Sequence, residues 1–255
     1  MKARIHKQDS RIIVYDAERI HQPGGHLFSE RAWERSACVV GQAPGRGSAL
    51  FLETDFGPAV LRHYLRGGWP ARFSRDRYLY TGIEQSRPMA EFNMLASLYD
   101  LGLAAPQPLA AQCVRQGLFY SGDLITRRIP DVMPLAELPD TRRGGPEAWH
   151  AAGACIRSFH DHGVMHADLN ARNILITGDN RVFLIDFDQA QIRHGATKLF
   201  QANLGRLKRS LHKFLSEEQL DYGWQQLLHG YNADPADQTV PGEDGCDNGQ
   251  TGAVR

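Results

Sequence analysis

The sequence predicts an α+β fold with two lobes, a β-rich N-lobe followed by a mainly helical C-lobe. Between residues 36 and 127, short apolar runs alternate with turns that contain Gly, Pro and Asp, which is typical of strands. Beyond residue 147, apolar residues recur at helical spacing over longer stretches. A chain of 255 residues with 42% hydrophobic residues can hold one large or one two-lobed domain with a real core.

Strands and short connections dominate the first half of the chain. Ser29 is a suitable N-cap for a short helix over residues 28–35. A longer helix is predicted over residues 86–101, with Ser86 as its cap and Pro88 in its first turn. The predicted strands are residues 12–15, three runs within residues 36–62, residues 110–114 and residues 118–127.

The second half is predicted to be helical around one β-hairpin. Apolar residues at helical spacing predict helices over residues 147–162, within residues 195–215 and over residues 216–231. Between the first two of these, the apolar runs 173–176 and 182–185 flank a Gly-Asp-Asn turn, which indicates a hairpin.

Five segments follow from this pattern. Residues 1–19 are a lead-in, residues 20–128 form the N-lobe, and residues 129–146 form a hinge and linker. Residues 147–231 form the C-lobe. Residues 232–255 are rich in Gly, Asp, Gln and Asn, and we predict that they are disordered.

Composition narrows the classes of protein. The formal net charge is zero, so we expect no nucleic-acid partner and no global attraction to an anionic membrane. The four cysteines show no C-x-x-C spacing, which indicates reduced thiols of a cytosolic protein. No stretch resembles a signal peptide or a membrane span, so we expect a soluble or peripheral protein on the cytoplasmic side.

The strongest signal lies in residues 162–188. His166, Asp168, Leu169 and Asn173 form the pattern H-x-D-L-x-x-x-N, and the second hairpin strand ends in Asp186-Phe187-Asp188. This ordered combination is typical of protein-kinase-like phosphotransferases, and it predicts a two-lobed protein-kinase-like fold. The alternative is a hairpin with polar surface residues.

The chemistry of phosphoryl transfer assigns roles to these residues. Asp168 can accept the proton of an incoming hydroxyl and is the candidate catalytic residue. Asn173 and Asp186 offer the oxygen ligands that Mg²⁺ prefers, so ATP and Mg²⁺ are the expected cofactors. We expect His166 to be a structural hydrogen-bonding residue, and His160 to lie at the surface or in a cap.

Candidates for binding the nucleotide phosphates lie in the N-lobe, residues 20–128, and we expect backbone groups of the hinge to hold the adenine. Gly41, Gly45 and Gly47 flank a turn in which backbone N–H groups can approach phosphates closely, although the same pattern fits a plain hairpin turn. The kinase template has a lysine on the third strand, but no lysine occurs between residues 7 and 198. Arg62 is the candidate cation, and Glu91 is its candidate partner. The alternatives are an exposed strand-end arginine and a glutamate favoured by the helix dipole.

Two basic groups are predicted to flank the cleft and to bind an anionic acceptor. No A-P-E segment, with which protein kinases dock peptides, is present, so a small-molecule or glycolipid acceptor is favoured. Exposed charges are screened by salt, so we expect peripheral membrane association that is sensitive to salt. The alternative for the arginines at residues 66–77 is that they only keep an exposed loop solvated. The two groups are Arg66, Arg72, Arg75 and Arg77, and Arg206, Lys208, Arg209 and Lys213.

Three stretches match a pattern that is narrower than the general kinase motif. They are Val60 to Tyr64 with Arg66-Gly67-Gly68, His166 to Leu175, and Asn203 to Ser210. On these stretches the chain resembles the lipopolysaccharide-core kinases of Gram-negative bacteria, and among them the kinases of 3-deoxy-D-manno-octulosonic acid (Kdo). The resemblance covers residues 20–230. It implies ATP-dependent phosphorylation of the Kdo 4-hydroxyl on a Kdo-bearing lipid A precursor, at the cytoplasmic face of the bacterial inner membrane.

Two alternatives stay open at this point. A related kinase could act on core heptose instead, although the Arg-Gly-Gly insertion favours Kdo. A pseudokinase binding module would be expected to lack Asp168, Asn173 or Asp186, and all three are present. The chain departs from the general kinase pattern at Asp188, where D-F-G has glycine, and at Arg62, which replaces lysine.

Overall fold

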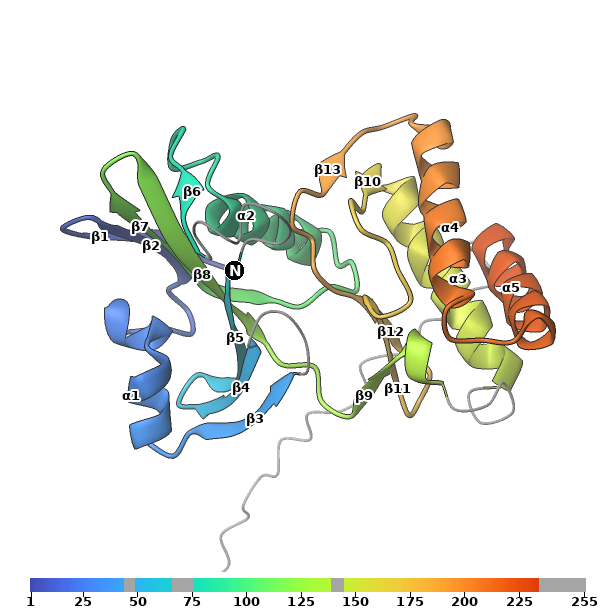
Figure 1. The fold of residues 1–255 in the computed structure, drawn as a ribbon, viewed down its shortest axis with the longest axis horizontal. Coiled ribbons are helices and arrows are strands. Elements are labelled where there is room, and N and C mark those ends of the chain that lie inside the picture. The colour runs from blue at the N-terminus through green and yellow to red at the C-terminus, as the bar shows by residue number, and fades with distance from the viewer. Residues whose placement is uncertain (44–48, 66–75, 139–144, 234–255) are drawn as a thin grey trace, which may run out of the picture.

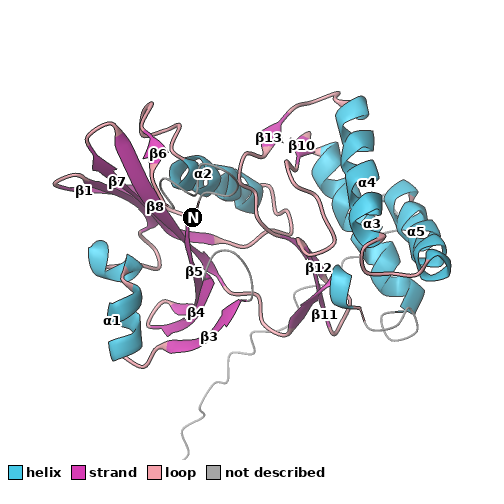
Figure 2. Ribbon diagram, in the orientation of Figure 1, coloured by secondary structure: helices cyan, strands magenta, loops and turns pink. Residues whose placement is uncertain are grey.

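A computed structural model describes residues 1–43, 49–65, 76–138 and 145–233. The chain forms two lobes, with the strands of the N-lobe gathered on one side and the helices of the C-lobe on the other (Figures 1 and 2). The predicted two-lobed α+β fold is confirmed. Gly45, Gly47, Arg66, Arg72, Arg75 and the tail from residue 234 lie outside the described residues.

The N-lobe is built on one antiparallel sheet. Its strands follow the order β1-β2-β7-β8-β5-β4-β3, and the short β6 pairs with β8. The three-strand run predicted within residues 36–62 is confirmed as β3, β4 and β5, which pair with one another in sequence order. The strands are β1 (Ala3–Gln8), β2 (Arg11–Asp16), β3 (Val39–Ala43), β4 (Ala49–Thr54), β5 (Gly57–His63), β6 (Tyr78–Leu79), β7 (Pro108–Gln116) and β8 (Phe119–Arg127).

The segment expected to be a lead-in contributes two strands to this sheet. The predicted strand at residues 12–15 is the centre of β2, which pairs with β1 on one side and with β7 on the other. β1 was not predicted, because most of its side chains are exposed and its sequence lacks apolar alternation. It forms as an edge strand on β2, and its Arg4 and Lys7 are the kind of charged residues that protect a sheet edge from further pairing.

The two faces of the N-lobe sheet pack differently. Helix α2 (Arg87–Asp100) covers one face with its predicted apolar stripe, of which Met89, Phe92, Leu95 and Leu98 are buried. A second core cluster includes Leu27 and Phe28 of the 3₁₀ helix η1 (Gly25–Phe28) together with Leu50, Leu52 and Leu61 of the sheet. Helix α1 (Glu30–Arg35) follows η1, and the Ser29 hydroxyl caps it by accepting from Ala32 N–H. Helix α2 therefore stands between the sheet and the C-lobe (Figure 1).

The C-lobe is organised around α3 (Gly145–Asp161), α4 (Thr197–Leu211) and α5 (Glu217–Asn232). Helices α3 and α5 approach closely at glycines: a Cβ on Gly153 would lie 1.9 Å from the Leu227 carbonyl oxygen. Ser216 begins α5 with a capping box that includes Gln219. None of the described helices is long and apolar enough to cross a bilayer.

Short strands flank the H-x-D-L-x-x-x-N motif and the D-F-D segment. The predicted hairpin is confirmed as β11 (Ile174–Thr177) and β12 (Val182–Leu184), with Asn180 at a φ of 62° in its turn. β9 (Val132–Pro134), in the segment predicted as the hinge, pairs with β11 and is followed by the 3₁₀ helix η3 (Leu135–Glu137). β10 (Val164–Met165) pairs with β13 (Gln191–Ile192), so the strands before and after the motif meet.

Candidate active site

Asp168 lies in the loop between β10 and β11 with an accessible carboxylate. Its side chain is 64% exposed, and its Oδ2 accepts a hydrogen bond from Asn170 Nδ2 at 3.0 Å. Arg206 Nη1 lies 3.7 Å from its Oδ1. The carboxylate is thus oriented by one amide and one cation while it stays open to an incoming hydroxyl, which is what a general base requires.

His166 connects this loop to the end of the hairpin. Its Nδ1 accepts from Asp168 N–H at 3.2 Å, so its Nε2 must carry the proton that is donated to the Ile185 carbonyl at 2.9 Å. Burial lowers the pKa of His166, which favours this neutral tautomer. The predicted structural role of His166 is confirmed, because both of its ring nitrogens are engaged by the backbone.

Asn173 is hydrogen-bonded back to the same loop. Its Nδ2 donates to the Asp168 carbonyl at 3.0 Å, so the amide oxygen is the atom that can be offered to a cation. Its own carbonyl accepts from Ile185 N–H at 3.0 Å, directly before Asp186. The hairpin therefore brings the two predicted metal ligands to one edge.

Asp186 adopts a backbone conformation that is uncommon for a residue with a Cβ. Its φ is 66°, in the left-handed region, where Asp is better tolerated than most residues. Such strain persists only where surrounding contacts hold it, and it concentrates at functional sites. The Asp186 side chain is 40% exposed, so one carboxylate oxygen can bind Arg62 while the group stays accessible.

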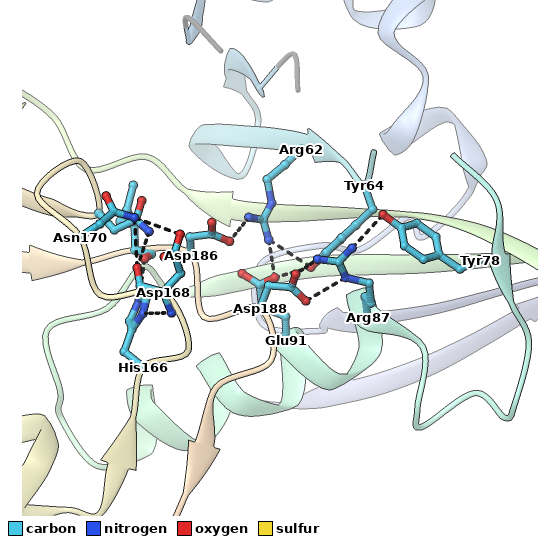
Figure 3. A network of polar contacts seen from close by, with 12 residues as sticks. Arg62, Tyr64, Tyr78, Arg87, Glu91, His166, Asp168, Asn170, Asp186 and Asp188 are labelled. Atoms are coloured by element: carbon cyan, nitrogen blue, oxygen red, sulfur yellow. Dashed lines mark hydrogen bonds and ion pairs between the residues drawn. The ribbon is translucent and has the colours of Figure 1, made fainter. Parts of the chain in front are cut away.

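Arg62 joins the N-lobe to this edge (Figure 3). From β5, its Nη1 donates to Asp186 Oδ1 at 2.5 Å, and its Nη2 forms an ion pair with Glu91 of α2. The Tyr64 hydroxyl donates to the same Glu91 oxygen at 2.5 Å. The predicted pairing of Arg62 with Glu91 is confirmed, and the exposed-arginine alternative is wrong.

Burial and the neighbouring charges act in opposite directions on the pKa values of Arg62 and Glu91. Glu91 is 3% exposed, and burial raises its pKa, whereas Arg62 and the Tyr64 hydroxyl oppose that shift. Burial would lower the pKa of Arg62, but Glu91, Tyr64 and Asp186 outweigh burial and raise it. A guanidinium resists deprotonation in proteins, so the positive charge of Arg62 persists and opposes the rise that burial causes in the pKa of Glu91.

Asp188 forms a second link between the lobes. Arg87, the first residue of α2, donates from Nε to Asp188 Oδ1 at 3.0 Å, and its Nη2 pairs with Oδ2. Asp186 and Gln189 have positive φ, but Asp188 does not, so the backbone at residue 188 does not require the glycine of D-F-G. This ion pair was not predicted, because its partners lie 101 residues apart.

Helix α4 holds the catalytic loop through three side chains on one face. Asn203 Nδ2 donates to the His166 carbonyl at 2.8 Å, Arg206 binds the Ala167 carbonyl, and the Ser210 hydroxyl accepts from Ala171 N–H at 3.2 Å. Their spacing of i, i+3 and i+7 is the signal that could have found them, because it places polar residues on one helical stripe. Among the predicted acceptor residues, Arg206 thus lies at the site.

Of the three glycines predicted to bind phosphates, Gly41 lies among the described residues. The sequence placed Gly41 in the turn, but β3 pairs with β4 up to Ala43, so Gly41 lies inside the strand. A Cβ there would lie 3.2 Å from the Phe51 ring, which explains a glycine at this position without a phosphate. Gly45 and Gly47 are outside the described residues.

The oxygen donors fit a cation that is shared with phosphates. Among the described residues, no group of three or more His, Cys, Asp or Glu side chains is arranged to hold a metal ion. Mg²⁺ in nucleotide sites commonly takes one or two carboxylates and completes its shell with phosphate oxygens and water. Asp186 and Asn173 match such a sparse ligand set.

This fold and this set of side chains define a protein-kinase-like phosphotransferase. Residues 30–231 match the family described as "Lipopolysaccharide kinase (Kdo/WaaP) family", and the chain belongs to that family. It is therefore an enzyme rather than a binding module without activity.

Similar proteins agree with this assignment. A 3-deoxy-D-manno-octulosonic acid kinase of Stenotrophomonas maltophilia (strain R551-3) is 44% identical over 210 residues, covering 82% of this chain and 83% of that protein. One of Xanthomonas axonopodis pv. citri (strain 306) is 44% identical over 223 residues, covering 86% and 88%. A solved structure described as "WaaP in complex with acyl carrier protein" covers 82% of this chain and 86% of its own, with 18% identity and a TM-score of 0.50. At this identity, the likeness to that structure concerns the fold alone.

Proposed function

We propose that this enzyme transfers the γ-phosphoryl group of ATP to the 4-hydroxyl of Kdo on a Kdo-bearing lipid A precursor. The proposal is carried by one observation: the accessible Asp168 carboxylate lies on the same hydrogen-bonded loop as Asn173, and Asp186 beside it is joined to the buried Arg62–Glu91 pair. The names of the relatives at 44% identity support Kdo as the acceptor.

Each residue has a defined task in this reaction. Asp168 accepts the proton of the acceptor hydroxyl as its oxygen bonds to the γ-phosphorus. The bond from that phosphorus to the bridging oxygen breaks, and ADP leaves with the electron pair. Asp186 and Asn173 would hold Mg²⁺, which neutralises charge on the phosphates. Arg62, held in place by Glu91 and Asp186, would add its positive charge on the side of the phosphates.

Arg206 provides the contact that distinguishes the acceptor. Its guanidinium is half-exposed beside Asp168, and Kdo, unlike a heptose, carries a carboxylate that a guanidinium can bind bidentately. Lys208 and Arg209 of α4 and Lys213 after it add local positive charge. We propose that they give peripheral, salt-sensitive association with the cytoplasmic face of the inner membrane.

The acceptor is tested with labelled ATP, Mg²⁺ and a panel of Kdo-bearing and heptose-bearing acceptors. Phosphate is expected on Kdo acceptors alone, and labelling of heptose alone would overturn the choice of acceptor. Arg206→Ala should raise the acceptor KM for Kdo, because it removes the partner of the acceptor carboxylate, and should leave the ATP KM within error. It should also lower turnover, because it removes the contacts with Ala167 and Asp168.

The base is tested with Asp168→Asn, which keeps the shape but not proton acceptance. Turnover should fall by about 10²-fold or more, on the scale of general-base contributions, while ATP affinity stays close to that of the wild type. Asp161→Asn is the matched control, since this aspartate lies on the surface of α3 and pairs with Arg157. Near-wild-type turnover in Asp168→Asn would contradict the assignment.

A further inference from the structure

We propose that the ion pair between Arg87 and Asp188 is a tether that positions the metal-binding loop for catalysis. Both residues are positioning residues, which act through Asp186 rather than by touching the substrate. The proposal rests on the proposed role of Asp186 as a ligand for Mg²⁺. It also explains the aspartate at the third position of D-F-D.

Arg87 is fixed in the N-lobe before it reaches Asp188. Its backbone N–H donates to the Tyr120 hydroxyl of β8 at 3.0 Å, and its Nη1 donates to the Tyr78 hydroxyl of β6 at 2.9 Å. Those two tyrosine rings stack with their centroids 5.4 Å apart. An arginine that is anchored at both its backbone and its fork loses little further conformational entropy when it binds a carboxylate.

The loop itself is held from the C-lobe at its middle residue. Phe187 is buried, and its ring stacks on Phe159 at 5.5 Å and contacts the His166 ring at 4.9 Å. Asp186 and Gln189 on either side have positive φ, which costs free energy that other contacts must offset. Asp188, only 13% exposed, supplies a contact on the N-lobe side (Figure 3).

The Arg62 contact cannot perform this task alone. Arg62 binds Oδ1 of Asp186, which is the carboxylate that a cation would share. A cation bound at Asp186 would draw on the same carboxylate charge, so the contact with Arg62 would weaken when the site is filled. The Arg87–Asp188 pair uses a different carboxylate, two residues away. It therefore holds the loop against α2 whether or not Asp186 carries a cation.

The tether is tested with Asp188→Asn and Arg87→Ala by two measurements. The Mg²⁺ concentration for half-maximal rate should rise by about 10- to 100-fold, the usual effect of removing a residue that orients a metal ligand, with the acceptor KM unchanged. Amide hydrogen exchange of residues 184–190 should accelerate in the variants without nucleotide or metal. Arg87→Lys, which keeps the charge but not the fork, should be intermediate.

A double variant separates a tether from two independent effects. If the pair acts as a unit, Arg87→Ala combined with Asp188→Asn should be no worse than either change alone. Arg157→Ala is the control, because it breaks an exposed pair on α3 that does not touch the loop. Lower thermal stability with unchanged Mg²⁺ dependence and unchanged exchange at residues 184–190 would overturn the proposal.

A failure of the proposed function would look different. If Asp186→Ala keeps the wild-type Mg²⁺ dependence, the metal-ligand role of Asp186 is wrong, and the positioning role of the tether is overturned with it. If Asp186→Ala changes that dependence and the Asp188 and Arg87 variants do not, the metal-ligand role stands and the tether alone is overturned.

Discussion

Replacing Arg62 by Met should expose how much the buried ion pair contributes to stability and why. Met keeps much of the length and apolar stem of Arg but removes the charge. Arg62 and the Tyr64 hydroxyl both donate to Glu91, whose side chain is 3% exposed. Of these two donors, the variant would keep the Tyr64 hydroxyl. A carboxylate left in that position must either stay charged without its cation or take up a proton.

The expected loss follows from the burial of Glu91. Breaking a buried ion pair by removing one partner costs about 3–5 kcal/mol, and we expect the lower end because Arg62 is itself 27% exposed. For a protein of this size, about 3 kcal/mol corresponds to a fall in Tm of about 6–12 °C. The Glu91→Gln/Arg62→Met double variant should regain most of this loss, since no buried charge remains, but not activity.

The loss should depend on pH with a defined sign. Burial already raises the pKa of Glu91, and without Arg62 it rises further above the unfolded value of about 4.3. Below that unfolded value both states are protonated, so the variant shows no charge-related penalty. The penalty grows as pH rises and is complete above the folded pKa. Urea denaturation of variant and wild type at pH 5 and pH 8 measures the difference.

Arg128→Met is the matched control. Arg128 is also 27% exposed and binds Glu53 at 2.7 Å, but Glu53 is 48% exposed. A pair of this kind contributes about 1 kcal/mol or less, with little dependence on pH in this range. The reasoning would be refuted if Arg62→Met were no more destabilising at pH 8 than Arg128→Met, or if its loss were equal at both pH values.

Three further predictions concern the metal site, helix packing and acid stability. Asp186→Ala should lower the rate and the apparent Mg²⁺ affinity, and Asn173→Ala should lower both by less, because an amide is neutral. A Mg²⁺ titration in which Asp186→Ala matches the wild type would rule out Asp186 as a ligand. Gly153→Ala should destabilise the protein by about 1–3 kcal/mol, because its Cβ would lie 1.9 Å from the Leu227 oxygen. Gly205→Ala in α4 should stabilise it by up to about 1 kcal/mol, because the nearest atom to the new Cβ is Arg209 Nη1 at 3.5 Å. Urea denaturation that shows the same sign for both variants would contradict the packing argument. Burial lowers the pKa of His160 to about 4, so the unfolded chain binds the extra proton first and stability should fall as pH drops from about 6.5 to about 4, by about 3 kcal/mol in total. Thermal melts at pH 7 and pH 5 should show a smaller fall for His160→Gln than for the exposed control His162→Gln, and equal falls would show that His160 is not the source.

His160 also shows where local patterns mislead. From the sequence we expected it at the surface or in a cap, but it is buried, with its ring stacked on Phe200 of α4 at 4.5 Å and its Nδ1 bonded to the Tyr231 hydroxyl of α5 at 2.8 Å. Both partners follow it by at least 40 residues, and no periodicity within α3 indicates which helices will cover its end.

The residues that perform the proposed chemistry could be found from sequence because their spacing is itself local. Asp168, Asn173 and Asp186 lie within 19 consecutive residues, and a loop followed by a tight hairpin is enough to bring them together. Helix α2 was equally predictable, since a proline in its first turn and an apolar stripe act within a few turns. Ser86 stands at the predicted N-cap position, but its hydroxyl donates to the Ile83 carbonyl and does not cap the helix. The Arg62–Glu91 pair followed from the kinase template, which supplies the long-range contact that spacing alone does not.

Only the tertiary structure decided the contacts that join distant segments without a local pattern. The sequence by itself determined the elements and the chemical groups of the loop, because hydrogen bonding and apolar periodicity act between near neighbours. It could not determine that β1 would find an edge on β2, or that Arg87 would meet Asp188. Such partners are chosen by the packing of α2 between the sheet and the C-lobe, and an ion pair forms only where that packing brings two charges within about 4 Å.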